Sequence, residues 1–468
     1  MVADPTSLTD RLARLRALDS RLLSAAELPA RPPRTRPASP EPRTLAAALG
    51  GRVESTADAE LVVVDRDLEI PFDPGPLRDL PYPVDPSCPL VLLDTETTGL
   101  GTGAGTVAFL IGLAWWSGPR FRVRQLWLPD HPHERGLLQA LAANLPERAW
   151  LVTYNGRSFD WPLLVARYRI HGQAPPPLAG HLDLLPVARG LWRHRLPDAR
   201  LASVEAGVAG IRRPSDLPGA LVPERYTRWL MTGDPGGLAA VADHNRQDVV
   251  SLACLLGELA GRLAVPERRS TVHPGDVAGL GRAFRRSGRL AEAIACLEAA
   301  IEGAENRSDR ASRALDPAVL GLERARLLVR AGRLDEARAA WQSATVGGGR
   351  AAIEAWICLA KDFEHRRGDL VAAGAATERA RGLLARRRAL GLFMPEAERD
   401  LAHRLRRLER RLARSRGRAK RPDYTAAPPI PTAREAPACT STNSTRATAT
   451  SSPTLSWPMR PSTTRRSS

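Results

Sequence analysis

The sequence predicts an α/β domain, in which helices flank a mixed sheet, followed by an all-helical domain. Between residues 90 and 260, short apolar runs that end in glycine-rich or turn segments alternate with segments whose apolar residues recur at helical spacing. From about residue 275 onward, helical spacing continues without further strand-like runs. The chain has 468 residues, of which 43% are hydrophobic, so it is long enough for two or three domains with sizeable cores.

The N-terminal region, residues 1–88, is predicted to hold a helix, a proline-rich linker and a short strand. Apolar residues have helical spacing over 7–26, and the proline- and arginine-rich stretch 29–42 is typical of an extended linker. The strand candidate is 61–64. The N-terminus lacks the long apolar core of a signal peptide, and the longest apolar run, 107–116, is too short to span a bilayer.

The α/β domain is predicted over residues 89–262. It opens with an apolar run at 90–93 that indicates a buried strand. Runs at 107–116 and 121–128, joined by Ser-Gly-Pro, predict two strands that pair antiparallel as a meander after the first strand. The remaining predicted elements are strands at 150–154 and 181–184, helices at 134–144, 159–170, 184–192, 201–209 and 238–260, and a loop at 212–226.

The helical domain, residues 270–402, contains an internal repeat. Segments 281–300 and 323–340 each consist of a helix, a Gly-Arg-Leu turn and an acidic, alanine-rich helix, and a weaker third copy surrounds Gly368. Helical pairs of this kind are typical of tetratricopeptide-like repeats, with an ordinary helical bundle as the alternative. Residues 403–468 are predicted to form a basic, largely disordered tail, because their Ser/Thr/Pro/Ala-rich end has little to bury.

Charge and cysteine content indicate the kind of partner and the compartment. The net charge of +17 suggests an anionic partner, with nucleic acid before a membrane surface. The five cysteines are scattered, without metal-binding spacing, as expected for reduced thiols. We therefore expect a cytoplasmic protein that binds nucleic acid and no membrane.

Acidic residues follow the first strand and recur later in the domain. Asp94 and Glu96 are two residues apart, so both project from the same face of an extended chain, and a divalent cation would relieve their repulsion. A solvated acidic turn is the alternative for this pair alone. Asp160 lies in the first turn of a predicted helix, where an acid also complements the helix dipole. His244 and Asp248 lie one turn apart on another helix, on what could be a solvated face.

The order of these motifs resembles a known enzyme family. DTETTG, then NGRSFD, then HNRQD is similar to the DEDD family of 3′–5′ exonucleases, which have a ribonuclease-H-like fold. FLIGLAWW, HLDLLPVARGLW, the loop at 216–219 and the tetratricopeptide-like C-terminus resemble the YprB-like ribonuclease-H-like proteins. The resemblance covers about residues 45–385, with the catalytic part at about 90–260.

The resemblance implies a role for each matching residue. The metal ligands would be Asp94, Glu96, Asp160 and Asp248, which would hold two Mg²⁺ or Mn²⁺ ions at the scissile phosphate. His244 would orient the attacking water or take its proton, although it stands at the spacing typical of tyrosine-type members, which leaves the general-base role open. The residues expected near the terminal nucleotide are Thr97, Thr98, Asn155 and Phe159. Asp183 is expected to be a helix cap or an acid that supports the site.

The sequence therefore predicts a hydrolase: a metal-dependent nuclease, specifically a 3′–5′ exonuclease that cleaves phosphodiester bonds at a single-stranded end of DNA or RNA. The helical repeats offer a surface for a protein partner. The alternative is a catalytically weak nucleic-acid-binding or adaptor protein that acts through the repeats and the basic tail.

Overall fold

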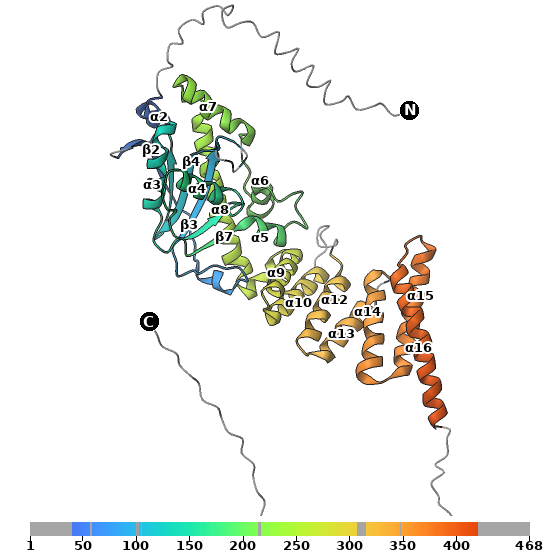
Figure 1. Cartoon of the computed structure of the whole chain (residues 1–468). Coiled ribbons are helices and arrows are strands. Elements are labelled where there is room, and N and C mark those ends of the chain that lie inside the picture. The colour runs from blue at the N-terminus through green and yellow to red at the C-terminus, as the bar shows by residue number, and fades with distance from the viewer. Residues whose placement is uncertain are drawn as a thin grey trace, which may run out of the picture. The chain divides into compact units, whose positions relative to one another are not determined.

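A computed structural model describes residues 40–56, 59–99, 101, 103, 105–213, 217–306, 315–346 and 348–419. The helix expected at 7–26, nearly all of the linker at 29–42 and the end of the predicted tail lie outside these residues. The chain divides into two compact units, residues 1–412 and 413–468. The first unit contains a mixed sheet with flanking helices, followed by a helical region (Figure 1), so the predicted α/β domain and all-helical domain are confirmed.

The sheet has seven strands among the described residues, in the order β1-β2-β5-β4-β3-β6-β7. The first five in this order pair antiparallel, including the predicted meander, whereas β6 and β7 continue the sheet parallel to β3. β3 therefore lies where the antiparallel and parallel halves meet. The strands are β1 (Arg52–Ser55), β2 (Glu60–Leu68), β3 (Leu90–Thr97), β4 (Ala108–Ser117), β5 (Arg120–Trp127), β6 (Trp150–Thr153) and β7 (Gly180–Asp183).

Helices cover both faces of this sheet, and β3 supplies side chains to both cores. Leu90 and Leu92 belong to one core, and Val91 and Leu93 belong to the other, which explains the continuous apolar run. The helices of the α/β domain are α2 (Pro42–Leu49), α3 (Glu134–Asn144), α4 (Asp160–Ile170), α5 (Leu184–Leu191), α6 (Leu201–Val204), α7 (Val222–Thr232) and α8 (Leu238–Glu258).

The α/β domain starts earlier in the chain than the sequence predicts. The expected boundary is residue 89, but β1 and β2 belong to the sheet, and β2 pairs with β5 from Val62 to Leu68. Leu45 of α2 is fully buried in the same core. The pairing of β2 with β5 joins residues on either side of the segment between β2 and β3, and local sequence patterns do not reveal such a contact. The loop expected at 212–226 also gives way to α7 from Val222 onward.

Antiparallel helices pack in sequence order through the helical region (Figure 1). The predicted turn residues Gly288, Gly332 and Gly368 all have positive φ, between 67° and 82°, which glycine adopts without strain. They separate the two helices in each of three successive pairs. The helices are α9 (Pro274–Arg286), α10 (Leu290–Asn306), α12 (Pro317–Arg330), α13 (Leu334–Ala344), α14 (Arg350–Asp362), α15 (Leu370–Ala389) and α16 (Pro395–Ala419).

The arginine-dense segment after residue 403 begins as part of the folded region, in contrast to the predicted tail. It belongs to α16, whose Leu401 and Leu408 are buried. Glu364 has no exposed side-chain surface and pairs with three arginines of α16: Arg404, Arg407 and Arg411. These arginines neutralise a buried acid. The sequence does not reveal this role, because a dense run of arginines is equally typical of a basic tail.

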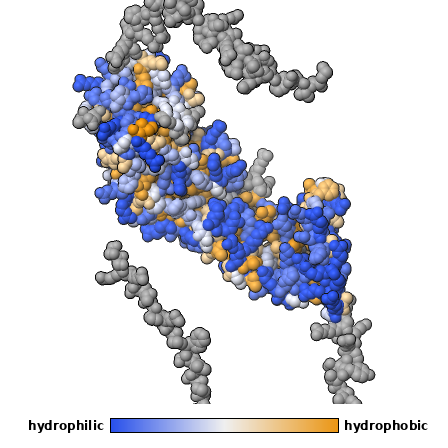
Figure 2. All heavy atoms as spheres, viewed as in Figure 1, coloured by the Kyte–Doolittle hydropathy of each residue, from blue (hydrophilic) through white to orange (hydrophobic). Residues whose placement is uncertain are grey.

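The visible surface of the helical region is mostly hydrophilic (Figure 2). An exception is the turn between α15 and α16, which exposes Leu390, Leu392 and Phe393. In the described part of the chain, no helix combines the length and apolar character needed to cross a bilayer.

Candidate active site

The first two predicted acids lie on one face of β3 near its end. Asp94 and Glu96 alternate with Leu93 and Thr95, which are buried on the opposite face. The carboxylate of Asp94 accepts a hydrogen bond from Nδ2 of Asn245 at 2.9 Å. The same amide nitrogen lies 3.3 Å from the backbone oxygen of Asp94. Asn245 is fully buried on α8, so it fixes both the strand end and the orientation of the acid.

Asp160, at the start of α4, lies near enough for its charge to act on Asp94 and Glu96. β6 runs parallel to β3, so the chain leaves both strands at the same edge of the sheet. The turn after β6 contains Asn155, whose φ of 68° is one that asparagine tolerates better than most residues. Asp160 is 6% exposed and accepts a hydrogen bond from Oγ1 of Thr95 at 2.5 Å. The strand that carries Asp94 and Glu96 therefore also positions Asp160.

α8 adds His244 and Asp248 to this group. Nε2 of His244 lies 3.9 Å from Oε1 of Glu96 and 3.7 Å from Oδ2 of Asp248. One potential ligand atom from each of these three residues lies within 4.8 Å of the others. Their side chains are only 13–16% exposed. The predicted one-turn spacing on a helix thus brings both residues to the end of β3.

The clustered acids disfavour one another's charged forms. Burial raises the pKa of Asp94 well above its usual range, and the negative charges of Asp248, Asp160 and Glu96 raise it further. Burial, followed by the charges of Asp248 and Asp160, raises the pKa of Glu96 to about 8. Burial also raises the pKa of Asp160, to about 6. Without a bound cation, these carboxyl groups either keep their protons or ionise at a cost in free energy.

Arg213 and Glu205 belong to the site, and sequence reasoning missed both. The Arg213 guanidinium forms ion pairs with Glu205, at 2.6 Å, and with Asp248. Its Nη1 lies 3.3 Å from Nδ1 of His244. Glu205 is 1% exposed and also accepts a hydrogen bond from Ser251. Arg213 lies in a loop and Glu205 beyond α6, so no periodic spacing could have linked them to α8.

The residues expected near the terminal nucleotide differ in accessibility. Thr97 is 8% exposed and its hydroxyl donates to the backbone oxygen of Gly99. The hydroxyl of Thr98 accepts from the Val107 backbone. Both threonines therefore have structural roles in holding the end of β3. Asn155 is exposed and Phe159 is half-buried, so their side chains remain accessible from solvent.

Asp183 supports the site from outside it. Its carboxylate caps α5 by accepting from the backbone N–H of Leu185 at 3.0 Å. The same carboxylate accepts from the backbone N–H of Asn155 at 2.7 Å. This geometry agrees with the expected helix-cap role, and it also fixes the turn that leads to Asp160.

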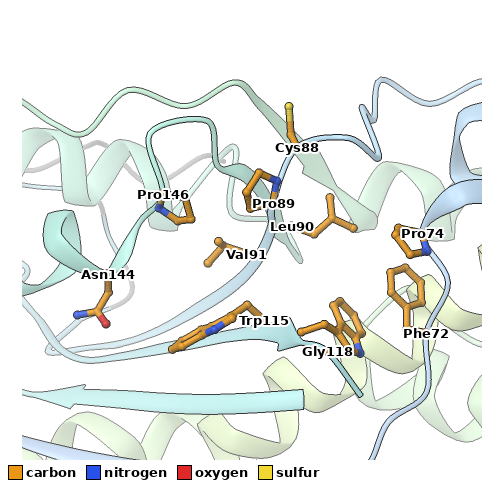
Figure 3. Close-up of a pocket in the computed structure, with 11 residues that line it drawn as sticks. Phe72, Pro74, Cys88, Pro89, Leu90, Val91, Trp115, Gly118, Asn144 and Pro146 are labelled. Carbon is orange, nitrogen blue, oxygen red and sulfur yellow. The ribbon is translucent and has the colours of Figure 1, made fainter. Parts of the chain in front are cut away.

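A separate cavity of about 320 Å³ lies at the beginning of β3 (Figure 3). Phe72, Pro89 and Trp115 point into a largely apolar space, and none of the predicted site residues lines it. Phe72 stacks on Trp116 with ring centroids 4.2 Å apart. Among its lining residues only Cys88 has an ionisable side chain, and its thiol already contacts Asp85. The cavity lining contains no carboxylate or imidazole, so it does not compete with the carboxylate cluster as a candidate active site.

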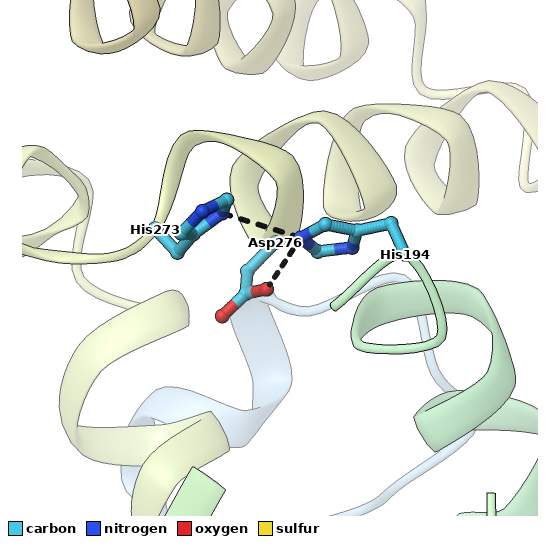
Figure 4. A group of neighbouring side chains, drawn as sticks. All are labelled: His194, His273 and Asp276. Atoms are coloured by element: carbon cyan, nitrogen blue, oxygen red, sulfur yellow. Dashed lines mark hydrogen bonds and ion pairs between the residues drawn. The ribbon is translucent and has the colours of Figure 1, made fainter. Parts of the chain in front are cut away.

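A second group of potential metal ligands joins α9 to the segment after α5 (Figure 4). Nε2 of His194 lies 3.2 Å from Nδ1 of His273 and 3.4 Å from a carboxylate oxygen of Asp276. Both oxygens of Asp276 already accept hydrogen bonds from Arg195, at 3.0 and 2.9 Å, and Nδ1 of His273 accepts from the backbone of Gly275. The cluster is therefore a hydrogen-bonded joint between the α/β domain and the helical region.

A protein-family comparison agrees with this fold. Residues 91–260 match the family model of the RNase H superfamily. A protein of Bacillus subtilis (strain 168), named uncharacterized protein YprB, is 34% identical over 281 residues. These residues are 59% of this chain and 65% of that protein, so the match spans just under two thirds of the relative's length. A solved family B DNA polymerase from the hyperthermophilic archaeon Pyrobaculum calidifontis overlaps 48% of this chain and 31% of its own, with 16% identity and a TM-score of 0.29.

Proposed function

Residues 91–260 form a ribonuclease-H-like domain, and from this premise we propose that the protein is a metal-dependent 3′–5′ exonuclease acting on DNA or RNA. The observation that carries the proposal is the cluster of Glu96, His244 and Asp248 at the end of β3, with Asp94 and Asp160 near enough for their charges to act on the same group. A protein that only binds polyanions gains nothing from buried acids that repel phosphate. The same acids are suited to holding divalent cations.

The donor set fits Mg²⁺ or Mn²⁺, because these ions prefer oxygen ligands. Two ions would be held by Asp94, Glu96, Asp160 and Asp248. Bound there, they would supply an activated water and stabilise the charge on the leaving 3′-oxygen. The protein orients this donor set through two hydrogen bonds, from Asn245 to Asp94 and from Thr95 to Asp160.

The contact between Arg213 and His244 indicates that His244 acts as a hydrogen-bond donor at its other ring nitrogen. An arginine can only donate, so Nδ1 of His244 accepts from Arg213 and the ring proton lies on Nε2. Nε2 faces the side of Glu96 and Asp248 on which a phosphate would bind. We propose that His244 donates from Nε2 to the attacking water or to a phosphate oxygen. In this tautomer His244 cannot take the water's proton at Nε2, which favours orientation over general-base catalysis.

The accessible residues of the turn after β6 would receive the 3′ end. Asn155 would contact the terminal nucleotide, and the half-buried ring of Phe159 would stack on its base, a contact that tolerates any sequence. The backbone at Thr97 and Thr98 would approach the terminal sugar. The helical pairs would form tetratricopeptide-like repeats and offer a surface for a protein partner.

The direct test is degradation of 5′-labelled single-stranded DNA and RNA by the full chain, with Mn²⁺, Mg²⁺ or EDTA. We expect products that shorten stepwise from the 3′ end, require metal and disappear with Asp94→Asn. A 3′-blocked oligonucleotide should resist degradation. Cleavage within a blocked strand would point to an endonuclease, and cleavage in EDTA would contradict the proposal.

One observation favours the alternative of a weakly catalytic nucleic-acid-binding or adaptor protein. Arg213 already pairs with Asp248, so the site carries a cation of its own that competes with metal for that carboxylate. Calorimetric titration with Mn²⁺ separates the two functions. An exonuclease should bind Mn²⁺ in a manner that depends on Asp94 and Asp160, whereas an adaptor should bind oligonucleotide with or without it.

A further inference from the structure

A groove of about 750 Å³ lies beside α5 and the turn after β6. Its lining includes Asn155, the accessible residue expected to meet the terminal nucleotide, and none of the clustered acids. The groove also borders the segment that leads to α6. Its lining residues are Tyr154, Asn155, Leu185, Arg189, Arg193, Pro197, Asp198, Ala199, Arg200 and Leu201.

Three arginines make the groove positively charged. Arg189, Arg193 and Arg200 are all exposed. In the described part of the chain, Arg189 and Arg193 form no ion pair, and Arg200 lies 3.8 Å from Asp198 with 87% of its side chain exposed. An exposed pair at that distance contributes little, so the guanidinium of Arg200 remains available. Asp198 is the one acid in the described lining, so the groove has a net positive charge.

The remainder of the lining is apolar and held in place. Leu185, Pro197 and Leu201 provide nonpolar surface between the arginines. The hydroxyl of Tyr154 donates to the backbone oxygen of Ala199 at 2.6 Å, which ties the far wall of the groove to the end of β6. Cationic groups beside nonpolar surface match an unpaired strand, which presents both phosphates and bases. A duplex presents mainly phosphates and stacks its bases inside.

We propose that this groove binds the backbone of single-stranded nucleic acid on the 5′ side of the terminal nucleotide. Arg189, Arg193 and Arg200 contact phosphates, for which the guanidinium group is suited, and the bases lie against the apolar residues. This inference rests on the proposed exonuclease function for its polarity, since Asn155 marks the 3′ end. It explains how a strand could be held while its end is cleaved.

The test measures binding by the full chain carrying Asp94→Asn, in EDTA, so that cleavage plays no part. Fluorescence anisotropy with a labelled 12-nucleotide single strand gives the association constant K at several salt concentrations. Replacing Arg189, Arg193 and Arg200 by glutamine should lower the magnitude of the slope of log K against log salt by about 2, at about 0.7 for each phosphate contact. It should also weaken binding more than about 10-fold at low salt.

A matched triple variant, Arg135→Gln with Arg148→Gln and Arg169→Gln, removes the same charge from exposed positions outside the groove and should leave the slope unchanged. Asp198→Asn should strengthen binding, because it removes the acid from the lining. Equal slopes in the two triple variants would overturn the groove proposal, as would a duplex bound as tightly as the single strand. Absence of cleavage by the unsubstituted chain in Mn²⁺ would instead count against the exonuclease proposal, independently of these slopes.

Discussion

At the scale of single residues, the site is a set of acids whose charges are only partly balanced. Among the residues that the structure describes, Asp94 forms no ion pair with a cation, whereas Asp248 shares Arg213 with Glu205. A bound metal ion should therefore stabilise the charged form of Asp94 most. A substitution of Asp94 should abolish catalysis while leaving binding of nucleic acid intact.

Asp94→Asn should lower the rate of metal-dependent cleavage by more than about 100-fold. Substituting a residue that only hydrogen-bonds to a metal ligand already lowers metal affinity or activity by about 10- to 100-fold. Binding of an oligonucleotide should persist or become stronger, because one negative charge near the phosphates is removed. Cleavage rate and anisotropy measure the two effects. The control is Asp335→Asn, whose carboxylate is 94% exposed on α13. Cleavage at the unsubstituted rate by Asp94→Asn would locate the activity elsewhere.

The hydrogen-bond donor role of His244 predicts a difference between two substitutions. Glutamine keeps an N–H donor near the position of Nε2, whereas alanine removes it. His244→Gln should retain more activity than His244→Ala, with a difference of about 10-fold or more, as expected for a lost hydrogen bond to a charged group. The comparison is made as kcat at saturating metal. Equal loss of activity in both variants would indicate that His244 acts in another way, with proton transfer as the first alternative.

At the scale of elements, the site depends on how closely α8 approaches the sheet. Gly112 of β4 faces Asn245, and a Cβ atom at residue 112 would lie 2.2 Å from its amide oxygen. That oxygen also accepts a hydrogen bond from Gln125 of β5 at 2.9 Å. The missing side chain therefore allows one buried asparagine to bridge two strands and to hold Asp94.

Gly112→Ala should push α8 away from β4 and lower the free energy of unfolding by about 1–3 kcal/mol, as overpacking does. The same shift should weaken Mn²⁺ binding, because Asn245 no longer holds Asp94. Chemical denaturation and calorimetry measure these effects. Gly257→Ala is the control on α8, since no atom lies within 4 Å of its added Cβ, and it should be neutral or stabilising by up to about 1 kcal/mol. Similar behaviour of the two variants would contradict this account of the contact.

The stability of the end of the helical region depends on the contact between Glu364 and α16. A chain that ends at residue 402 loses Arg404, Arg407 and Arg411 and leaves the buried carboxylate of Glu364 without them. It should be less stable by about 3 kcal/mol, which is typical of a buried charge that loses its partners. A chain that ends at residue 419 should keep the stability of the full chain. Equal melting temperatures for the two truncations would show that these ion pairs contribute little.

At the scale of the whole molecule, the acid cluster couples stability to pH and metal. The pKa of Glu96 is raised to about 8 and that of Asp160 to about 6, compared with about 4.3 and 3.9 for unperturbed side chains. A carboxyl group whose pKa is higher in the folded state stabilises the fold fully below its unfolded pKa. That contribution is lost as the pH rises through the folded pKa.

The metal-free protein should therefore lose stability from these groups between about pH 4 and pH 8. Mn²⁺ should raise the melting temperature at pH 8 more than at pH 5, because it binds the ionised acids. Differential scanning fluorimetry with and without Mn²⁺ isolates this difference from all other titrating groups. The protein with Asp94→Asn and Asp160→Asn should lose most of the pH-dependent part of the effect. A metal effect that does not vary with pH would contradict this coupling.

Much of the fold could be read from local patterns, because each depends on neighbouring residues. The apolar run before Asp94 predicted a strand buried on both faces, and Gly288, Gly332 and Gly368 marked turns that need positive φ. Two predictions, the start of the α/β domain and the start of the tail, were wrong because they depend on contacts between distant segments. The residues before 89 join the sheet through pairing with β5, and the arginines after 403 serve Glu364, and both contacts link segments far apart in the chain.

The same division holds for the candidate site. The order of the motifs, together with their resemblance to a known family, named Asp94, Glu96, Asp160, His244 and Asp248. Only the tertiary structure added Arg213, Glu205 and Asn245, which meet those residues across the sheet edge. Spacing along the chain reports which residues share a face, but charge balance and the ring tautomer of His244 depend on groups that approach through space. The sequence therefore determined which acids are present, and the packing of α8 and the Arg213 loop decided how they are balanced.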